Sequence, residues 1–325
     1  MKVRKRRRTE KTEPPVPYKP GRIESLANLI ERVDNGSIPV PAGVHAATLS
    51  AALTELDAFV GAGSIKRLVT NMVVLVCLGL NDTDDFTNVA ITGNPGTGKT
   101  CMLGIIAEVW CALFHGKKGR VTWLCRPQLI GEHLGETACK TARALADAAP
   151  GVVVIDEVYS LGAGTTSSKG DSFAKECIDT LNQFISECRT EITVIVAGYT
   201  DATNECFFAQ NPGLLRRFPW QFKIEDYTPD ELIRIARLQL ERGGWTAFDG
   251  WTLLPDVAAI LKHAPNNGGD TQLLLHECKL AHAMRVPSKS ELRFLTADDF
   301  ALACKQILRA RAADAPTTSC MYMYT

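Results

Sequence analysis

The chain has 325 residues, 46% of them apolar, and its 36 basic and 36 acidic side chains give a formal net charge of zero. This length allows two packed domains with a sizeable core. The neutral balance hides an asymmetry, because residues 1–20 hold eight Lys and Arg against two Glu. The remaining chain is therefore mildly acidic, which gives no reason to expect a nucleic-acid partner for the folded part.

Eleven cysteines and six histidines are scattered along the chain, and no two cysteines form a C-x-x-C pair. This pattern is typical of free thiols in a reducing compartment, not of a disulfide framework or a metal site. The longest apolar run, residues 72–80, is too short to cross a bilayer, and no apolar signal segment follows the basic start. We therefore expect an intracellular protein, cytoplasmic or nuclear given the basic run Lys2–Arg8, without membrane association.

The predicted elements divide the chain into five parts. Residues 1–22, basic and rich in proline, are expected to form a disordered arm, and residues 23–53 a helical extension. Residues 54–226 are expected to form an α/β domain, residues 227–312 an all-helical lid and residues 313–325 a flexible tail. The first helices predicted from apolar spacing are 23–33, 46–59 and 64–79.

Strand and helix patterns then alternate. The predicted strands are 87–92, 120–125, 151–155, 191–197 and 220–224. The predicted helices between them are about 99–114, 136–148, 172–187 and 202–209. This alternation indicates a parallel sheet with helices on both faces. Beyond Thr228, which forms a capping box with Glu231, only helices are predicted, at about 229–242, 254–263, 270–285 and 296–311.

Residues 93–100 read Gly-Asn-Pro-Gly-Thr-Gly-Lys-Thr and fit the phosphate-binding template G-x-x-x-x-G-K-[ST]. The glycines let the backbone turn tightly and bring its N–H groups close to phosphate oxygens. Lys99 places a charge on the β- and γ-phosphates, and Thr100 offers a hydroxyl to Mg²⁺. The loop follows a predicted strand and precedes a predicted helix, which is the context that the template requires.

Two carboxylates, Asp156 and Glu157, follow the apolar strand 151–155. At the carboxyl edge of a parallel sheet, Asp156 can hold the Mg²⁺ shell and Glu157 can polarise the attacking water. The next strand ends at Gly198-Tyr199-Thr200-Asp201, where a polar residue either contacts the γ-phosphate or simply closes a turn. Arginines in the loop 211–218 suit an arginine finger acting on a neighbouring subunit's nucleotide, or else are solvated surface charges.

Together these features resemble the AAA+ ATPases. Four segments resemble more closely the branch that contains the red-type rubisco activase CbbX and the stage V sporulation protein K: residues 129–137, 155–161, 196–199 and 211–214. The resemblance covers about residues 54–285. It implies a P-loop α/β domain with a helical lid, ATP and Mg²⁺ as cofactors, and a ring, usually a homohexamer, that uses ATP hydrolysis to remodel a protein client.

The resemblance also assigns residues. Those implied to bind the nucleotide, the first two at the adenine, are Val60, Gly61, Gly93, Asn94, Pro95, Gly96, Thr97, Gly98, Lys99, Thr100 and Cys101. Those implied for catalysis are Lys99, Glu157 and Arg217, with Thr100 and Asp156 at the metal. Arg217 falls on the family's finger, and Arg216 stands where the family often has serine.

Two departures from the family bear on the motor. His133 replaces the aromatic residue of the pore loop, which weakens the grip on a threaded chain and can titrate near neutral pH. Residues 267–272 align with the lid's Asn-x-Arg-x-x-Arg segment but contain neither arginine, since Gly269 and Gln272 stand in those positions. The contact between the lid and the γ-phosphate is therefore in doubt.

Three functions follow from these patterns. The first is an ATP-hydrolysing ring that remodels a protein client, and the intact phosphate loop and carboxylate pair favour it. The second is a scaffold that assembles on ATP but threads weakly, which the two departures favour. The third, an ATPase directed to nucleic acid, rests only on the basic arm. Rubisco as the client rests on analogy alone, because a fold does not fix a substrate.

Overall fold

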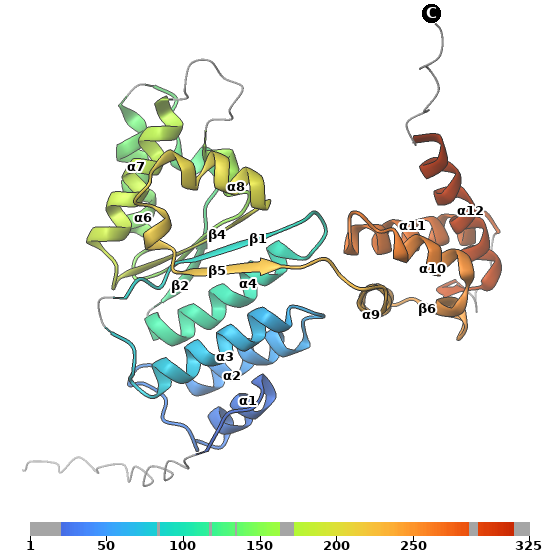
Figure 1. Ribbon diagram of the computed structural model, residues 1–325, viewed down its shortest axis with the longest axis horizontal. Coiled ribbons are helices and arrows are strands. Elements are labelled where there is room, and N and C mark those ends of the chain that lie inside the picture. Colours follow the sequence, from blue (N-terminus) through green and yellow to red (C-terminus); the bar gives the residue numbers. More distant parts are fainter. Residues whose placement is uncertain are drawn as a thin grey trace, which may run out of the picture.

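A five-stranded parallel sheet organises the first part of the molecule (Figure 1). The computed structural model describes residues 21–82, 85–116, 119–133, 135–162, 172–285 and 292–314, so almost all of the expected arm and tail lies outside the described residues. The strands are β1 (Val89–Gly93), β2 (Arg120–Trp123), β3 (Gly151–Ile155), β4 (Ile192–Gly198) and β5 (Trp220–Ile224). Their order is β2-β3-β4-β1-β5 and all neighbours are parallel, which confirms the predicted sheet.

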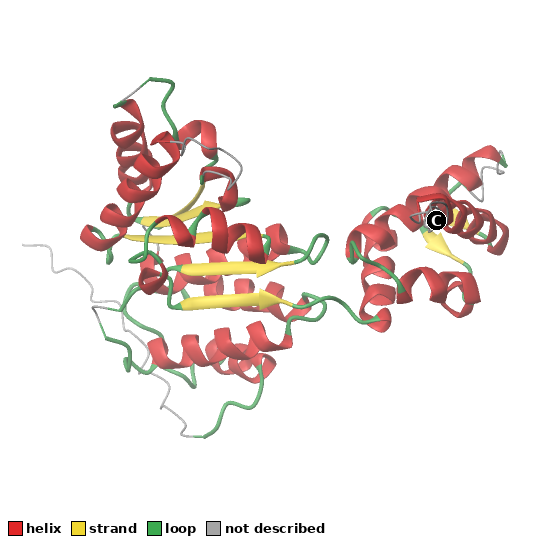
Figure 2. Cartoon of the chain, turned by 45° about the horizontal axis from the view of Figure 1, so that its top comes forward, coloured by secondary structure: helices red, strands yellow, loops and turns green. Residues whose placement is uncertain are grey.

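Alternate residues of the central strands face opposite layers of helices. In β3, Val152 and Val154 pack into one core and Val153 and Ile155 into the other. Because both faces are buried, the strand reads as an unbroken apolar run. One layer contains α1 (Leu26–Asp34), α2 (Ala46–Ala58), α3 (Gly63–Cys77) and α4 (Lys99–Trp110). The other contains α5 (Arg126–Leu129), α6 (Glu136–Ala148), α7 (Ser172–Glu187) and α8 (Thr200–Cys206) (Figures 1 and 2).

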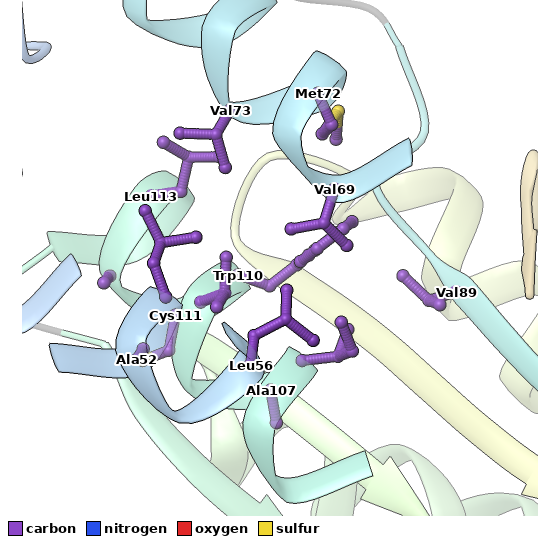
Figure 3. Packing of buried hydrophobic residues seen from close by; sticks show 14 of the residues in the cluster. Ala52, Leu56, Val69, Met72, Val73, Val89, Ala107, Trp110, Cys111 and Leu113 are labelled. Atoms are coloured by element: carbon purple, nitrogen blue, oxygen red, sulfur yellow. The ribbon is translucent and has the colours of Figure 1, made fainter. Parts of the chain in front are cut away.

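The amino-terminal helices belong to the same packed unit as the sheet. Leu29 of α1 and Leu53 of α2 are fully buried in one cluster with Trp110 of α4. Figure 3 shows Leu56 of α2 and Val69 of α3 packed around the same tryptophan. The expected boundary between residues 53 and 54 falls inside α2, so the extension and the α/β domain form one unit.

The chain after β5 forms the predicted lid, a second unit with its own core. Its helices are α9 (Pro229–Arg242), α10 (Pro255–Lys262), α11 (Gly268–Met284) and α12 (Ala297–Asp314). The capping box forms as predicted, because Glu231 N donates to Thr228 Oγ1 and Thr228 N donates to Glu231 Oε2. One correction is needed to the all-helical expectation. Strands β6 (Thr246–Ala247) and β7 (Phe294–Leu295) pair in parallel, and two residues are too few for a periodicity to reveal.

The remaining differences from the predicted helices are local. The helix predicted over 99–114 ends at Trp110 and continues as a π-helical turn, Cys111–His115. The single-turn helix α5 was not predicted, since four residues carry no helical period. Among the described residues, no helix is both long and apolar enough to span a lipid bilayer.

Candidate active site

The phosphate loop joins the carboxyl end of β1 to the first turn of α4. Gly96 and Gly98 have φ angles of 70° and 84°, a left-handed conformation that glycine adopts without steric cost. A Cβ atom at Gly93 would lie 2.9 Å from the carbonyl oxygen of Ile224. Backbone geometry therefore explains each glycine of the template. The loop also ends at the amino terminus of α4, where unpaired backbone N–H groups favour an anion.

Lys99 begins α4 and is held between the loop and the neighbouring strand ends. Its Nζ donates to Asn94 O at 2.8 Å and lies 4.4 Å from the centre of the Tyr199 ring. Burial lowers the pKa of Lys99, and the charges of Asp156 and Glu157 oppose that shift without cancelling it. The ammonium group is thus partly desolvated, a state in which a bound anion would be strongly favoured.

Thr100 and Asp156 meet across the site. Thr100 Oγ1 donates to Asp156 Oδ2 at 2.5 Å, which joins the first turn of α4 to the end of β3. A hydroxyl and one carboxylate suit Mg²⁺, which proteins usually bind through one or two side chains together with phosphates and water. The donor set therefore fits a magnesium ion carried by a nucleoside triphosphate.

Glu157 has an uncommon backbone conformation. Its φ and ψ angles are 51° and 45°, and its N–H donates to Asp156 Oδ1 at 2.9 Å. A left-handed residue other than glycine costs roughly 1–3 kcal/mol and persists only where its surroundings enforce it. This turn separates the directions of the two adjacent carboxylates, so that Asp156 contacts Thr100 while Glu157 contacts the Tyr159 hydroxyl.

Two stacked tyrosines connect the lysine to the second carboxylate. The rings of Tyr159 and Tyr199 lie 5.5 Å apart with planes inclined by 20°. Burial, followed by the charge of Glu157 and a hydrogen bond to it, raises the pKa of Tyr159 to about 12, so its hydroxyl stays protonated and donates to the carboxylate. A Cβ at Gly198 would lie 2.9 Å from the Tyr159 ring, so glycine there permits the stack.

Val60 and Gly61, the residues expected at adenine, lie where the α/β domain meets the lid. Val60 is buried, and Gly61 has a φ of 74°. A Cβ at Gly61 would lie 3.1 Å from the Tyr227 ring and 2.9 Å from Glu231 Oε1. Tyr227 in turn donates its hydroxyl to Thr97 O at 2.8 Å. The two expected residues are therefore near the phosphate loop, while the neighbouring Cys101 is exposed.

Arg217 lies away from the phosphate loop of its own chain. Its backbone oxygen accepts a hydrogen bond from Asn88, which immediately precedes β1. The phosphate loop follows the other end of that strand, roughly 16 Å away for five residues. The Arg217 guanidinium donates to Ser186 Oγ at 2.5 Å and to Gly213 O at 2.7 Å, whereas Arg216 is exposed. The structure thus brings Lys99, Thr100, Asp156 and Glu157 together and leaves Arg217 apart from them.

Two comparisons place the chain among known proteins. The model of the "ATPase family associated with various cellular activities (AAA)" matches residues 89–225. A CfxQ homologue of Pyropia yezoensis is 32% identical over 70% of this chain and 76% of its own length. The chain belongs to the AAA ATPase family.

Other relatives support the CbbX branch, whose members also carry the name CfxQ. A putative cfxQ-like protein of Acanthamoeba polyphaga mimivirus is 32% identical over 74% of this chain. A chloroplastic ribulose bisphosphate carboxylase/oxygenase activase of Cyanidioschyzon merolae is 32% identical over 58% of it. The chain spans only 59% and 66% of the lengths of these two relatives. The sequence resemblance to this branch is confirmed.

The AAA domain is an ATP hydrolase domain, and its motifs explain most of the site. The sequence did not reveal the part played by Tyr159, although this residue lies in the quoted segment 155–161. It also missed Asp226, whose carboxylate accepts hydrogen bonds from Asn94 and Asn267. Asp226 carries no local signal, because its two partners are distant along the chain.

Proposed function

We propose that this protein is a ring of identical subunits, a homohexamer, that hydrolyses ATP with Mg²⁺ and remodels a protein client. One observation carries the ring: Arg217 lies at the opposite end of β1 from the phosphate loop. Arg217, the predicted arginine finger, is therefore not at the site of its own chain, and a second copy in a head-to-tail ring would supply it.

Each residue has a chemical part in this proposal. The phosphate loop and Lys99 hold the β- and γ-phosphates, and Thr100 and Asp156 hold the magnesium ion. The ion, when bound, neutralises charge on the phosphate oxygens. Glu157 orients and polarises the attacking water, and Tyr159 fixes the position of its carboxylate. Arg217 of the neighbouring copy stabilises the charge that develops on the transferred phosphoryl group.

Complementation between two inactive variants tests the shared site. Lys99→Ala and Arg217→Ala should each lower steady-state ATP hydrolysis by about 10³-fold. Mixed in equal amounts, they should recover roughly a quarter of the wild-type rate, because a quarter of random head-to-tail interfaces combine an intact loop with an intact arginine. A wild type no faster than Lys99→Ala would overturn the hydrolase, and a mixture without recovery would overturn the shared site.

Assembly and client have a common test. Glu157→Gln should bind ATP without hydrolysing it, and light scattering of this variant with ATP should give the mass of a hexamer. A monomer in that state would contradict the ring. Proteins retained on the ATP-bound variant and released by ADP are the candidate clients, with Lys99→Ala as the matched control. Rubisco would be one of them if the activity named for the Cyanidioschyzon merolae relative applies here.

The alternative is a scaffold that assembles on ATP and threads weakly. Gly269 and Gln272, which replace the two lid arginines, favour it, as does His133, which is exposed. A hexamer whose hydrolysis is no faster with a retained client than without it would favour the scaffold. The basic run Lys2–Arg8 supports a cytoplasmic or nuclear site of action, which deletion of residues 1–9 would test by a change in cellular distribution.

A further inference from the structure

The lid holds the phosphate loop through the loop's own backbone. Three consecutive carbonyl oxygens of the loop accept hydrogen bonds from residues beyond β5. Asn267 Nδ2 donates to Pro95 O at 3.2 Å, and Gly268 N donates to Gly96 O at 3.0 Å. Tyr227 donates its hydroxyl to Thr97 O at 2.8 Å. Figure 1 shows the loop after β1 reaching toward the start of α11.

A carboxylate joins both sides of this contact. Asp226 accepts two hydrogen bonds from Asn94 Nδ2, each 3.0 Å long, and a third from Asn267 Nδ2 at 2.9 Å. Asn267 Oδ1 in turn accepts from Tyr227 N at 2.9 Å. The Asn267 amide is thus used at both its nitrogen and its oxygen, and its residue is only 2% exposed. We call Asp226, Asn267 and the groups they bond the lid clamp.

The backbone of Asn267 shows that this contact is enforced. Its φ and ψ angles are 49° and −120°, a region that costs a residue other than glycine about 1–3 kcal/mol. A glycine would fit without strain, but it would lack the amide that binds Asp226 and Pro95. The approach is also close: a Cβ at Gly96 would lie 1.8 Å from Asn266 O.

We propose that Asn267 and Asp226 are positioning residues for the phosphate loop. In this chain the lid senses the nucleotide through the backbone of the loop, because Gly269 and Gln272 offer no guanidinium to the γ-phosphate. The proposal rests on the proposed function only in placing a nucleotide at the loop. It requires neither hydrolysis nor a ring.

A lid that acts through the loop backbone and a lid that contacts the γ-phosphate predict different nucleotide selectivity. Pro95, Gly96 and Thr97 lie in the cradle shared by ATP and ADP, so loss of the clamp weakens both nucleotides by the same factor. A contact to the γ-phosphate would weaken ATP and spare ADP. We expect about tenfold weaker binding of each, equivalent to about 1.4 kcal/mol, which is the size of one or two lost hydrogen bonds.

The experiment titrates the full chain with fluorescent ATP and ADP analogues in Mg²⁺. Asn267→Gly removes the amide and relieves the backbone, so it should remain folded while binding both analogues about tenfold more weakly. Asp226→Ala should show the same loss, and the double variant should lose no more than either single one, because the two residues act together. Asn266→Ala, an exposed neighbour, is the matched control and should bind as the wild type does.

Three results would overturn the proposal. The first is wild-type affinity in a folded Asn267→Gly. The second is a loss confined to ATP, which would assign the lid to the γ-phosphate. The third is additive losses in the double variant, which would mean that the two residues act separately. Failure of hydrolysis in the wild type would overturn the proposed function and leave these titrations interpretable.

Discussion

A half-buried histidine beside the sheet should make the fold sensitive to mild acid. His115 ends the π-helical turn after α4, and its Nε2 lies 3.1 Å from Thr193 Oγ1. That hydroxyl is also 2.7 Å from Thr87 Oγ1, so the ring belongs to a small, partly buried polar network. Burial lowers the pKa of His115 from 6.5 to about 4.

The size of the effect follows from proton linkage. Below pH 6.5 the unfolded chain binds a proton at His115, whereas the folded chain does not until the pH falls to about 4. Above pH 6.5 the free energy of unfolding therefore contains the full contribution of the neutral His115. As the pH is lowered below 6.5, the free energy of unfolding falls by about 1.4 kcal/mol per pH unit, to a total loss of about 3 kcal/mol near pH 4. A domain with about 5–15 kcal/mol of stability would lose a large part of it.

Urea unfolding at several pH values between 7.5 and 4 measures this contribution. His115→Gln keeps a group that can bond to Thr193 but cannot be protonated. Between pH 7 and pH 5, its free energy of unfolding should therefore rise by about 2 kcal/mol relative to that of the wild type. His276→Gln, on the exposed face of α11, should follow the wild-type profile. Parallel profiles for wild type and His115→Gln would refute the reasoning, because protonation of the His115 ring would then not be coupled to unfolding.

Three further predictions concern the site. Gly96→Ala should weaken ATP binding more than tenfold, since its Cβ would lie 1.8 Å from Asn266 O and alanine disfavours the positive φ; wild-type affinity in a nucleotide titration would contradict this close approach. Arg217→Ala should abolish hydrolysis and spare ATP affinity, whereas Arg216→Ala, at an exposed position, should hydrolyse ATP at nearly the wild-type rate. If Arg216→Ala were the more damaging variant, Arg216 and not Arg217 would be the arginine finger. Gly269→Arg should raise kcat severalfold by returning a guanidinium to the lid, and an unchanged kcat in steady-state assays would show that this position does not limit the motor.

Local sequence predicted the sheet and most helices because their signals are short in range. The β-branched run 152–155 suits a strand buried on both faces, and it forms most of the inner strand β3. The helices predicted at 136–148 and 172–187 have those same bounds in the structure. The phosphate loop and the pair Asp156 and Glu157 were equally accessible, because each motif is a continuous segment whose residues act where the chain places them.

The contacts between segments could not be predicted in the same way. Asn94 and Asp226 are 132 positions apart, and Asp226 and Asn267 are 41 apart. Nothing near Asp226 distinguishes it from any solvated aspartate. Tyr159 and Tyr199 come from different strand ends, and their stack depends on a register that only the folded sheet fixes. A single sequence therefore predicts the candidate nucleotide-binding residues more readily than the residues that hold them in place.

Backbone strain marks the same site independently of any motif. In the part of the chain that the structure describes, the residues other than glycine with positive φ are Ala62, Glu157 and Asn267. Ala62 follows the expected adenine segment, Glu157 ends the carboxylate pair and Asn267 is the centre of the lid clamp. Each costs roughly 1–3 kcal/mol and persists only where the surrounding contacts enforce it. Three segments far apart in sequence thus store strain around one loop, so tertiary contacts, and not local propensity, hold these three backbone conformations.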